Sequence, residues 1–90
     1  MKAARVVIDV LAGRQGRPAS SIHPWMSLAR DLGVTPLHLV LVALDVAAIE
    51  DVELDVQDLQ HVTTVADLVH LFVHATPRAR QPLIELDVAS

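Results

Sequence analysis

A long apolar segment after Thr35-Pro36 is the feature that most limits how this chain can fold. From Leu37 to Leu44, His38 is the one residue that is not apolar. Proline suits the first turn of a helix, where its missing N–H would have no partner, and a preceding threonine can cap that turn. The sequence therefore predicts a helix over 36–49 that is apolar on nearly all sides.

Helical spacing divides this segment into two apolar strips. The first, which we expect to face the core, contains Leu37, Val40, Leu41, Leu44 and Ala48. The second contains Leu39, Val42 and Val46. The small core of a 90-residue chain cannot easily cover both strips. The second strip is therefore predicted to be an exposed interaction surface. Its burial against the first helix and the preceding loop remains the alternative.

The segment before this helix predicts another helix and a long loop. The apolar residues over 2–13 have helical spacing, and we expect the helix that they form to end at Gly13 or Gly16. Their apolar stripe is Val6, Val7, Val10 and Leu11. Residues 16–24 hold two Pro, two Ser and a Gly, which is typical of a loop. We expect Ile22 and Trp25 to anchor this loop in the core.

The second half of the chain predicts an acidic connection over 50–55 and one short helical turn over 56–59. Thr64 and Asp67 then have the spacing of a capping box, and the helix that they open ends at Pro77. Its apolar stripe is Val65, Leu68, Phe72 and Ala75. The expected fold is an all-α bundle of three main helices and one short helix over 1–77. A C-terminal tail over 78–90 is expected to be flexible or ordered by a partner.

The charged residues are unevenly distributed. Between Asp31 and Pro77 there are eight carboxylates and no Lys or Arg, and six of the acids lie in 45–58. Nucleic-acid binding needs clustered cations, so this distribution argues against it. A basic partner surface or a solvated acidic loop fits it equally well.

Several other classes of protein are excluded. The chain has no Cys, so disulfides, thiolate metal sites and thiol catalysis are absent. The uncharged apolar stretch over 34–44 is too short to span a bilayer, which needs about 20 residues. The first residues do not resemble a secretory signal, and we expect a cytoplasmic protein.

Several short motifs in one order give a resemblance to a known family. They are Ile22, Ser27-Leu28, Asp31-Leu32-Gly33, Leu37, Val40 and Val62-Thr63-Thr64-Val65. From about Arg5 to Ala75 this order and spacing resemble acyl carrier proteins. The resemblance implies a small helical carrier fold that serves fatty-acid, polyketide or related thioester synthesis. In that family a Ser at the start of the second helix carries a phosphopantetheine arm, whose thiol holds the acyl chain.

This chain departs from the family pattern at the attachment position. The family sequence Asp-Leu-Gly-x-Asp-Ser-Leu corresponds here to residues 31–37, with Thr35 in place of the acid and Pro36 in place of the Ser. Proline has no hydroxyl and cannot accept the arm. The family also displays acids along this helix, whereas here the first acid is Asp45.

We therefore expect a carrier-like module, not an enzyme, that has no phosphopantetheine or other cofactor. It would dock without a covalent bond onto an enzyme of acyl or polyketide biosynthesis, or form a homodimer. The expected interaction residues are Leu39, Val42, Val46, His38, Asp45, Glu50, Asp51 and Glu53. The alternative is a true acyl carrier that uses an unusual attachment residue such as Thr35.

The remaining polar candidates have simpler interpretations. Ser27 is expected to order its loop and not to act as a nucleophile, because no Gly-x-Ser-x-Gly motif surrounds it. His70 and His74 have the i, i+4 spacing that can share a metal, but the His-Glu-x-x-His pattern is absent. We predict no metal site and no set of catalytic residues.

Overall fold

The computed structural model describes residues 2–77 of the chain. The elements are helix α1 (Lys2–Gln15), a short 3-10 helix η1 (Ala19–Ser21), helix α2 (Pro36–Glu50), a 3-10 helix η2 (Val56–His61) and helix α3 (Val65–Val73). This arrangement confirms the predicted all-α class, with three main helices and a short one before the last, and it adds η1 within the first loop. The tail predicted over 78–90 lies outside the described residues.

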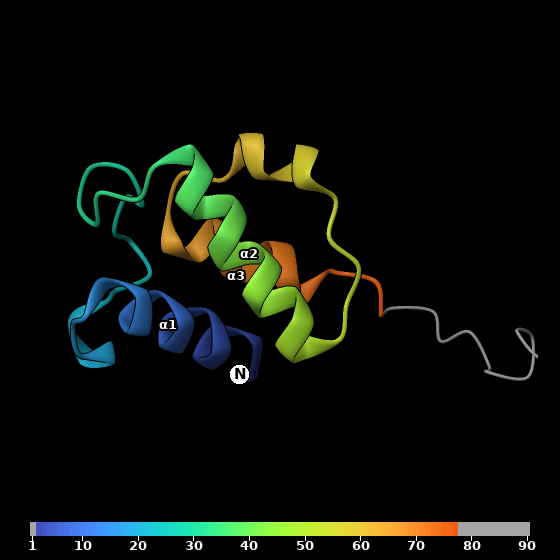
Figure 1. Cartoon of the computed structure of the whole chain (residues 1–90), viewed down its shortest axis with the longest axis horizontal. Coiled ribbons are helices and arrows are strands. Elements are labelled where there is room, and N and C mark those ends of the chain that lie inside the picture. The colour runs from blue at the N-terminus through green and yellow to red at the C-terminus, as the bar shows by residue number, and fades with distance from the viewer. Residues whose placement is uncertain (1, 78–90) are drawn as a thin grey trace, which may run out of the picture.

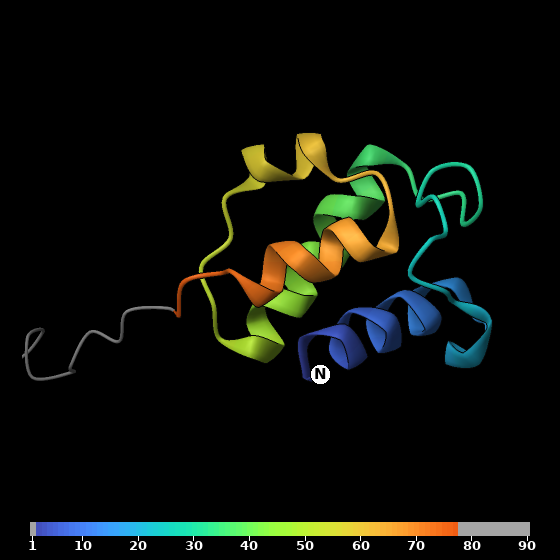
Figure 2. The same ribbon diagram turned by 180° about the vertical axis from the view of Figure 1, so that it is seen from behind.

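The three long helices pack into one bundle, in which α1 contacts both α2 and α3. Figure 1 shows α2 crossing in front of α3, with α1 beneath both. From behind, α3 lies in front of α2, and η2 remains on the side of the bundle away from α1 (Figure 2). The long loop between α1 and α2 therefore closes one end of the bundle.

One apolar core joins all three long helices, the first loop and η2. It contains Val7, Leu11 and Ala12 of α1, Leu39, Val42, Ala43, Val46 and Ala47 of α2, Val65, Leu68 and Phe72 of α3, and Ile22, Leu28, Leu32, Val34 and Leu59 from the loop and η2. Within residues 2–77, no polar or charged residue is buried. The stripe predicted for the last helix is confirmed at Val65, Leu68 and Phe72, and Ala75 is half-buried.

The assignment of the two strips of α2 was wrong, because the structure buries the opposite one. Leu39, Val42 and Val46 lie in the core, whereas Leu37, Leu41 and Leu44 are exposed. The two alanines Ala43 and Ala47 explain the difference. Together with the buried large residues they complete an i, i+3, i+4, i+7, i+8 face, along which α2 can approach its neighbours closely. Spacing of the large apolar residues alone did not reveal this face.

Trp25 was expected to anchor the first loop, and this expectation was wrong. Its side chain is 69% exposed and stacks on His23, with ring centroids 5.6 Å apart and planes within 2° of parallel. Ile22, the other predicted anchor, is buried. Leu28, Leu32 and Val34 also fill the core beneath this loop, which leaves the indole on the surface.

Helix ends follow ordinary capping chemistry. Gly16, at φ 64°, ends α1, and the N–H of Arg17 donates to the carbonyl of Ala12 over 3.1 Å, which is a Schellman closure. Of the two predicted stops, Gly16 is therefore correct. At the start of α3, Thr64 and Asp67 form the predicted capping box. The side chain of Asp55 caps η2 by accepting from the N–H of Gln57 over 3.0 Å.

Replacing Phe72 tests the core. Phe72→Ala removes a large side chain that is only 5% exposed, so we expect it to lower the free energy of unfolding by about 3–5 kcal/mol. Val73→Ala, next to it on α3 but on the exposed side, should cost much less. Thermal or urea unfolding measures both variants, and equal effects would contradict the burial of this face.

The capping box of α3 predicts a pH dependence. The backbone N–H of Thr63, its hydroxyl and the N–H of Thr64 all donate to Asp67, and these bonds hold the pKa of that carboxyl below its ordinary value of 3.8. A pKa that is lower in the folded state stabilises the fold above the unfolded pKa, and this stabilisation is lost as pH falls through the folded value.

We therefore expect Asp67→Asn to destabilise the protein at pH 7, and the difference from wild type to shrink as pH falls below about 4. Urea unfolding at several pH values measures this difference. Asp58→Asn, at an exposed acid outside the box, controls for the change in net charge. A difference that stays constant down to about pH 2 would contradict the linkage.

Candidate functional site

The start of α2 is held in place by the Asp31-Leu32-Gly33 turn. The carboxylate of Asp31 accepts from the N–H of Ser27 over 2.7 Å, and the hydroxyl of Ser27 accepts from the N–H of Arg30 over 3.1 Å. Gly33 has a φ of 65°, a left-handed conformation that glycine adopts without strain. The Ser27 hydroxyl thus orders the loop, as predicted. This network fixes where the first turn of α2 begins.

Thr35 and Pro36 occupy the exposed tip of this helix. Thr35 is the N-cap, and its hydroxyl oxygen accepts from the N–H of His38 over 3.2 Å, as the sequence predicted. Pro36 is the first helical residue and brings neither a hydroxyl nor an N–H. The hydroxyl at the tip of α2 therefore belongs to the capping residue Thr35, one position before Pro36.

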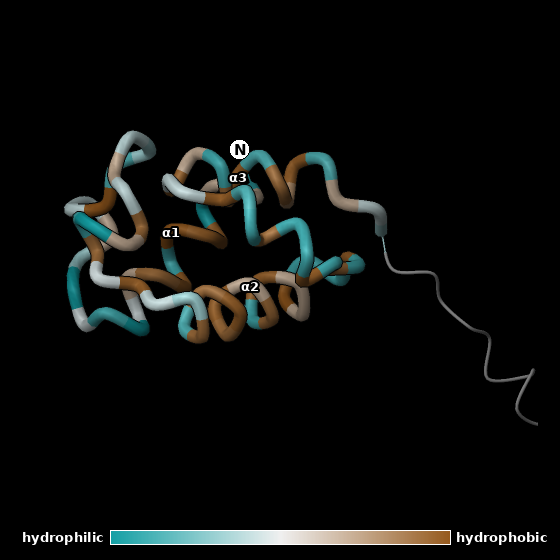
Figure 3. Tube along the Cα trace, turned by 90° about the horizontal axis from the view of Figure 1, so that it is seen from above, coloured by the Kyte–Doolittle hydropathy of each residue, from teal (hydrophilic) through white to brown (hydrophobic). Residues whose placement is uncertain are grey.

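An exposed apolar strip runs along α2 from this tip. We call it the outer strip: Leu37, Leu41, Leu44 and Ala48. Leu37 is 69% exposed, Leu44 48% and Leu41 38%. The tube in Figure 3 is brown over most of α2, the colour of hydrophobic residues, on both its core and its outward side.

The charges of α2 are neutralised by α1. Asp45 accepts from Arg14 twice, at 2.9 Å from Nε and 2.6 Å from Nη2. Glu50 lies 3.9 Å from the amine of Lys2. Asp45 and Glu50 are the acids of α2, which has no Lys or Arg. The outward side of α2 is therefore apolar and close to neutral.

The predicted interaction residues fall into two groups. Leu39, Val42 and Val46 are buried and cannot meet a partner, so the surface expected at these positions was wrongly placed. The others are at least partly accessible: His38 and Asp45 beside the outer strip, and Glu50, Asp51 and Glu53 at and beyond the C-terminal end of α2. Sequence reasoning missed Leu37, Leu41 and Leu44 as surface residues. The signal that identifies them is the pair Ala43 and Ala47 on the opposite face.

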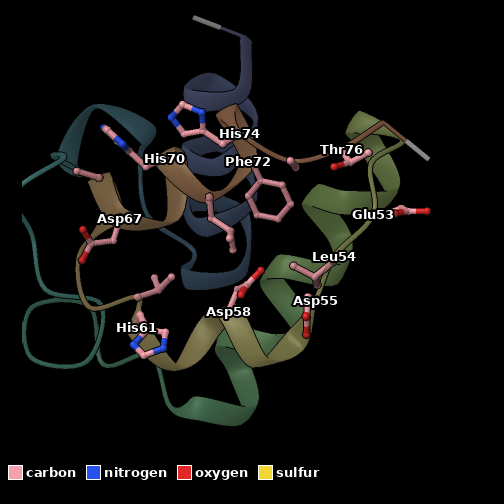
Figure 4. A pocket seen from close by; sticks show the side chains of 14 residues that line it. Glu53, Leu54, Asp55, Asp58, His61, Asp67, His70, Phe72, His74 and Thr76 are labelled. Carbon is pink, nitrogen blue, oxygen red and sulfur yellow. The ribbon is translucent and has the colours of Figure 1, made fainter. Parts of the chain in front are cut away.

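A second feature is a hollow of about 640 Å³ between α3, η2 and residues 53–55. Leu54, Val62, Leu71 and Phe72 form its apolar part, and Glu53, Asp55 and Asp58 lie on the side formed by η2 and the preceding segment (Figure 4). His70 and His74 lie on the opposite side, with ring centroids 6.0 Å apart.

These polar groups are not arranged as a metal site in the described part of the chain. Within residues 2–77, no group of three or more His, Cys, Asp or Glu side chains is arranged to hold a metal ion. The carboxylate of Asp67, which also lines the hollow, already accepts three hydrogen bonds in the turn before α3.

No model of a known protein family matches the chain, and no curated protein sequence matches it. Among residues 2–77, no helix has both the length and the apolar character needed to cross a bilayer. Of the surfaces described above, the outward side of α2 is the one on which three exposed leucines follow one another at helical spacing.

The capping role of Thr35 predicts the effect of replacing it. Thr35→Ala should lower the free energy of unfolding by about 1 kcal/mol, because the N–H of His38 loses its side-chain acceptor. Thr35→Ser keeps a capping oxygen and should stay within a few tenths of a kcal/mol of wild type. Urea unfolding compares the three proteins. Equal stability of all three would show that the hydroxyl does not stabilise the helix end.

Proposed function

We propose that this chain is an acyl-carrier-like module of fatty-acid or polyketide-type biosynthesis that carries no phosphopantetheine and acts by non-covalent association through α2. The observation that carries the proposal is Pro36 at the first position of α2, where carrier proteins have their attachment Ser. The surrounding motifs keep the family's order, and the helical bundle is compatible with it.

The chemistry of attachment is missing at this position. An arm is transferred when a hydroxyl oxygen gives up its proton to a base of the transferase and attacks the diphosphate phosphorus of coenzyme A that bears the pantetheine group. A phosphodiester forms, the bond to the second phosphate breaks, and adenosine 3′,5′-bisphosphate leaves. Pro36 offers no such oxygen, and it also removes an N–H that would face the phosphate at the helix N-terminus. Of the early N–H groups of α2, that of His38 is bonded to Thr35.

The outward side of α2 supports association by apolar contact. Carrier proteins of the family present acids on this helix to basic patches of their enzymes. Here Asp45 and Glu50 are paired with cations of α1, and three leucines occupy the accessible face. A partner would therefore need an apolar groove and not a basic patch.

The rival function is a true carrier that attaches the arm to Thr35. Its support is the position of an exposed threonine hydroxyl at a helix N-terminus, next to the family's site. Against it stands the capping bond of the same hydroxyl, which fixes its orientation toward the first turn. The two functions differ in one observable, the covalent mass.

Incubation with a phosphopantetheinyl transferase and coenzyme A tests the proposal. We expect the intact mass of the wild type to stay unchanged while an authentic carrier protein in the same mixture is modified. A gain of one phosphopantetheine group, mapped to Thr35 or to any Ser, would overturn the proposal.

A double variant tests the relation to carriers separately. Thr35→Asp with Pro36→Ser rebuilds the family's Asp-Ser-Leu sequence over residues 35–37. Modification of this variant at the new Ser would support the relation. If the folded variant stays unmodified while a carrier protein in the same mixture is modified, the result counts against a carrier ancestry.

A further inference from the structure

We infer that the outer strip of α2 is the seam of a homodimer, in which α2 packs antiparallel against α2 of a second copy. The inference deepens the proposed function, on which it rests for the role of α2 as the association surface. It specifies the partner, the direction of the partner helix and the residues that meet.

The first support is the spacing of the strip. Leu37, Leu41, Leu44 and Ala48 follow one another at intervals of four, three and four residues, which is the apolar repeat of a two-helix seam. No other segment of residues 2–77 lies outside α2 on this side of the bundle in Figures 1 and 3. A second helix can therefore approach along the whole length of the strip.

The sizes of the side chains fit an antiparallel pair. A two-fold axis midway between Leu41 and Leu44 sets Leu41 of one copy against Leu44 of the other, and the reverse. The same axis sets Leu37, the most exposed of the three leucines, against the small Ala48. Large side chains thus meet in the middle, and a large one meets a small one at each end.

Charge favours the antiparallel direction and a second copy as the occupant. His38 and Asp45 lie on the same flank of the strip, seven residues apart. In the antiparallel pair, His38 of each copy comes within one helical turn of Asp45 of the other, which Arg14 already contacts. In a parallel pair the two-fold axis would place this flank of the two copies on opposite sides of the seam, so His38 would not approach Asp45 of the other copy. Because the acids of α2 are paired with α1, two copies approach without strong repulsion.

Cysteine cross-linking tests the arrangement, since the chain has no Cys of its own. In the double variant Leu37→Cys/Ala48→Cys, each new thiol faces the other thiol of the second copy, so mild oxidation should give a covalent dimer. Within one copy the two positions are about 16 Å apart along the helix, too far for a disulfide.

The matched controls are the single variants. Leu37→Cys or Ala48→Cys alone should not cross-link to itself, because the antiparallel axis separates like positions by about 16 Å. Leu37→Cys/Val56→Cys, which moves the second thiol to an exposed residue of η2, should also stay monomeric on a denaturing gel. Cross-linking of Leu37→Cys alone as efficient as that of Leu37→Cys/Ala48→Cys would overturn the antiparallel dimer.

Sedimentation of the full chain gives a second, independent measurement. We expect the wild type and Val56→Glu to sediment as dimers at high concentration and Leu41→Glu as a monomer, with circular dichroism showing retained helix in all three. A wild type that is still monomeric at about 1 mM would overturn the homodimer. If that monomer binds a biosynthetic enzyme and Leu41→Glu abolishes the binding, the strip belongs to a different partner.

Different experimental results would reject the homodimer and the proposed function without an arm. A monomeric wild type whose mass is unchanged by the transferase rejects the homodimer and leaves the arm-free function standing. A dimeric wild type that gains the arm rejects the function and supports the seam.

Discussion

The rotation of α2 about its own axis decides most of what this molecule presents to its surroundings. Because nearly every residue of α2 is apolar, burial of either strip would satisfy the hydrophobic effect. The small side chains of Ala43 and Ala47 settle the choice, since they let the buried face approach the rest of the core closely. The double hydrogen bond from Arg14 to Asp45 fixes the same rotation from the surface. Leu37, Leu41 and Leu44 are exposed as a consequence.

Local hydrogen bonds were the most predictable part of the structure. Thr35, Thr64 and Asp67 cap helices as their spacing indicated, because a cap depends on residues within one turn and little on the rest of the fold. The core position of Phe72 was also predictable, since α3 is amphipathic and has one apolar face available. These features are determined within single segments of the chain.

Three features depended on tertiary packing and were not predictable from spacing. The exposed strip of α2 was assigned to the wrong face, because a helix that is apolar all round gives no preferred direction until its neighbours are placed. Trp25 was assigned to the core as an apolar residue of the first loop, but the space under this loop is filled by Leu28, Leu32 and Val34. The hollow beside Phe72 arises from three segments of the chain that meet only in the folded state, and no single pattern reveals it.

The pairing of the acids of α2 with α1 and the apolar character of α2 have related physical consequences. A helix that displays unpaired acids repels a second copy of itself, and it suits transient docking on basic enzymes. Here Asp45 and Glu50 are paired with Arg14 and Lys2, so this repulsion is reduced and leucine burial can favour association. Self-association and docking on an enzyme would use the same strip. A partner that binds the free strip would therefore shift the equilibrium from dimers to monomers by mass action. The concentration of the chain would set the fraction of copies whose strip is free to bind that partner.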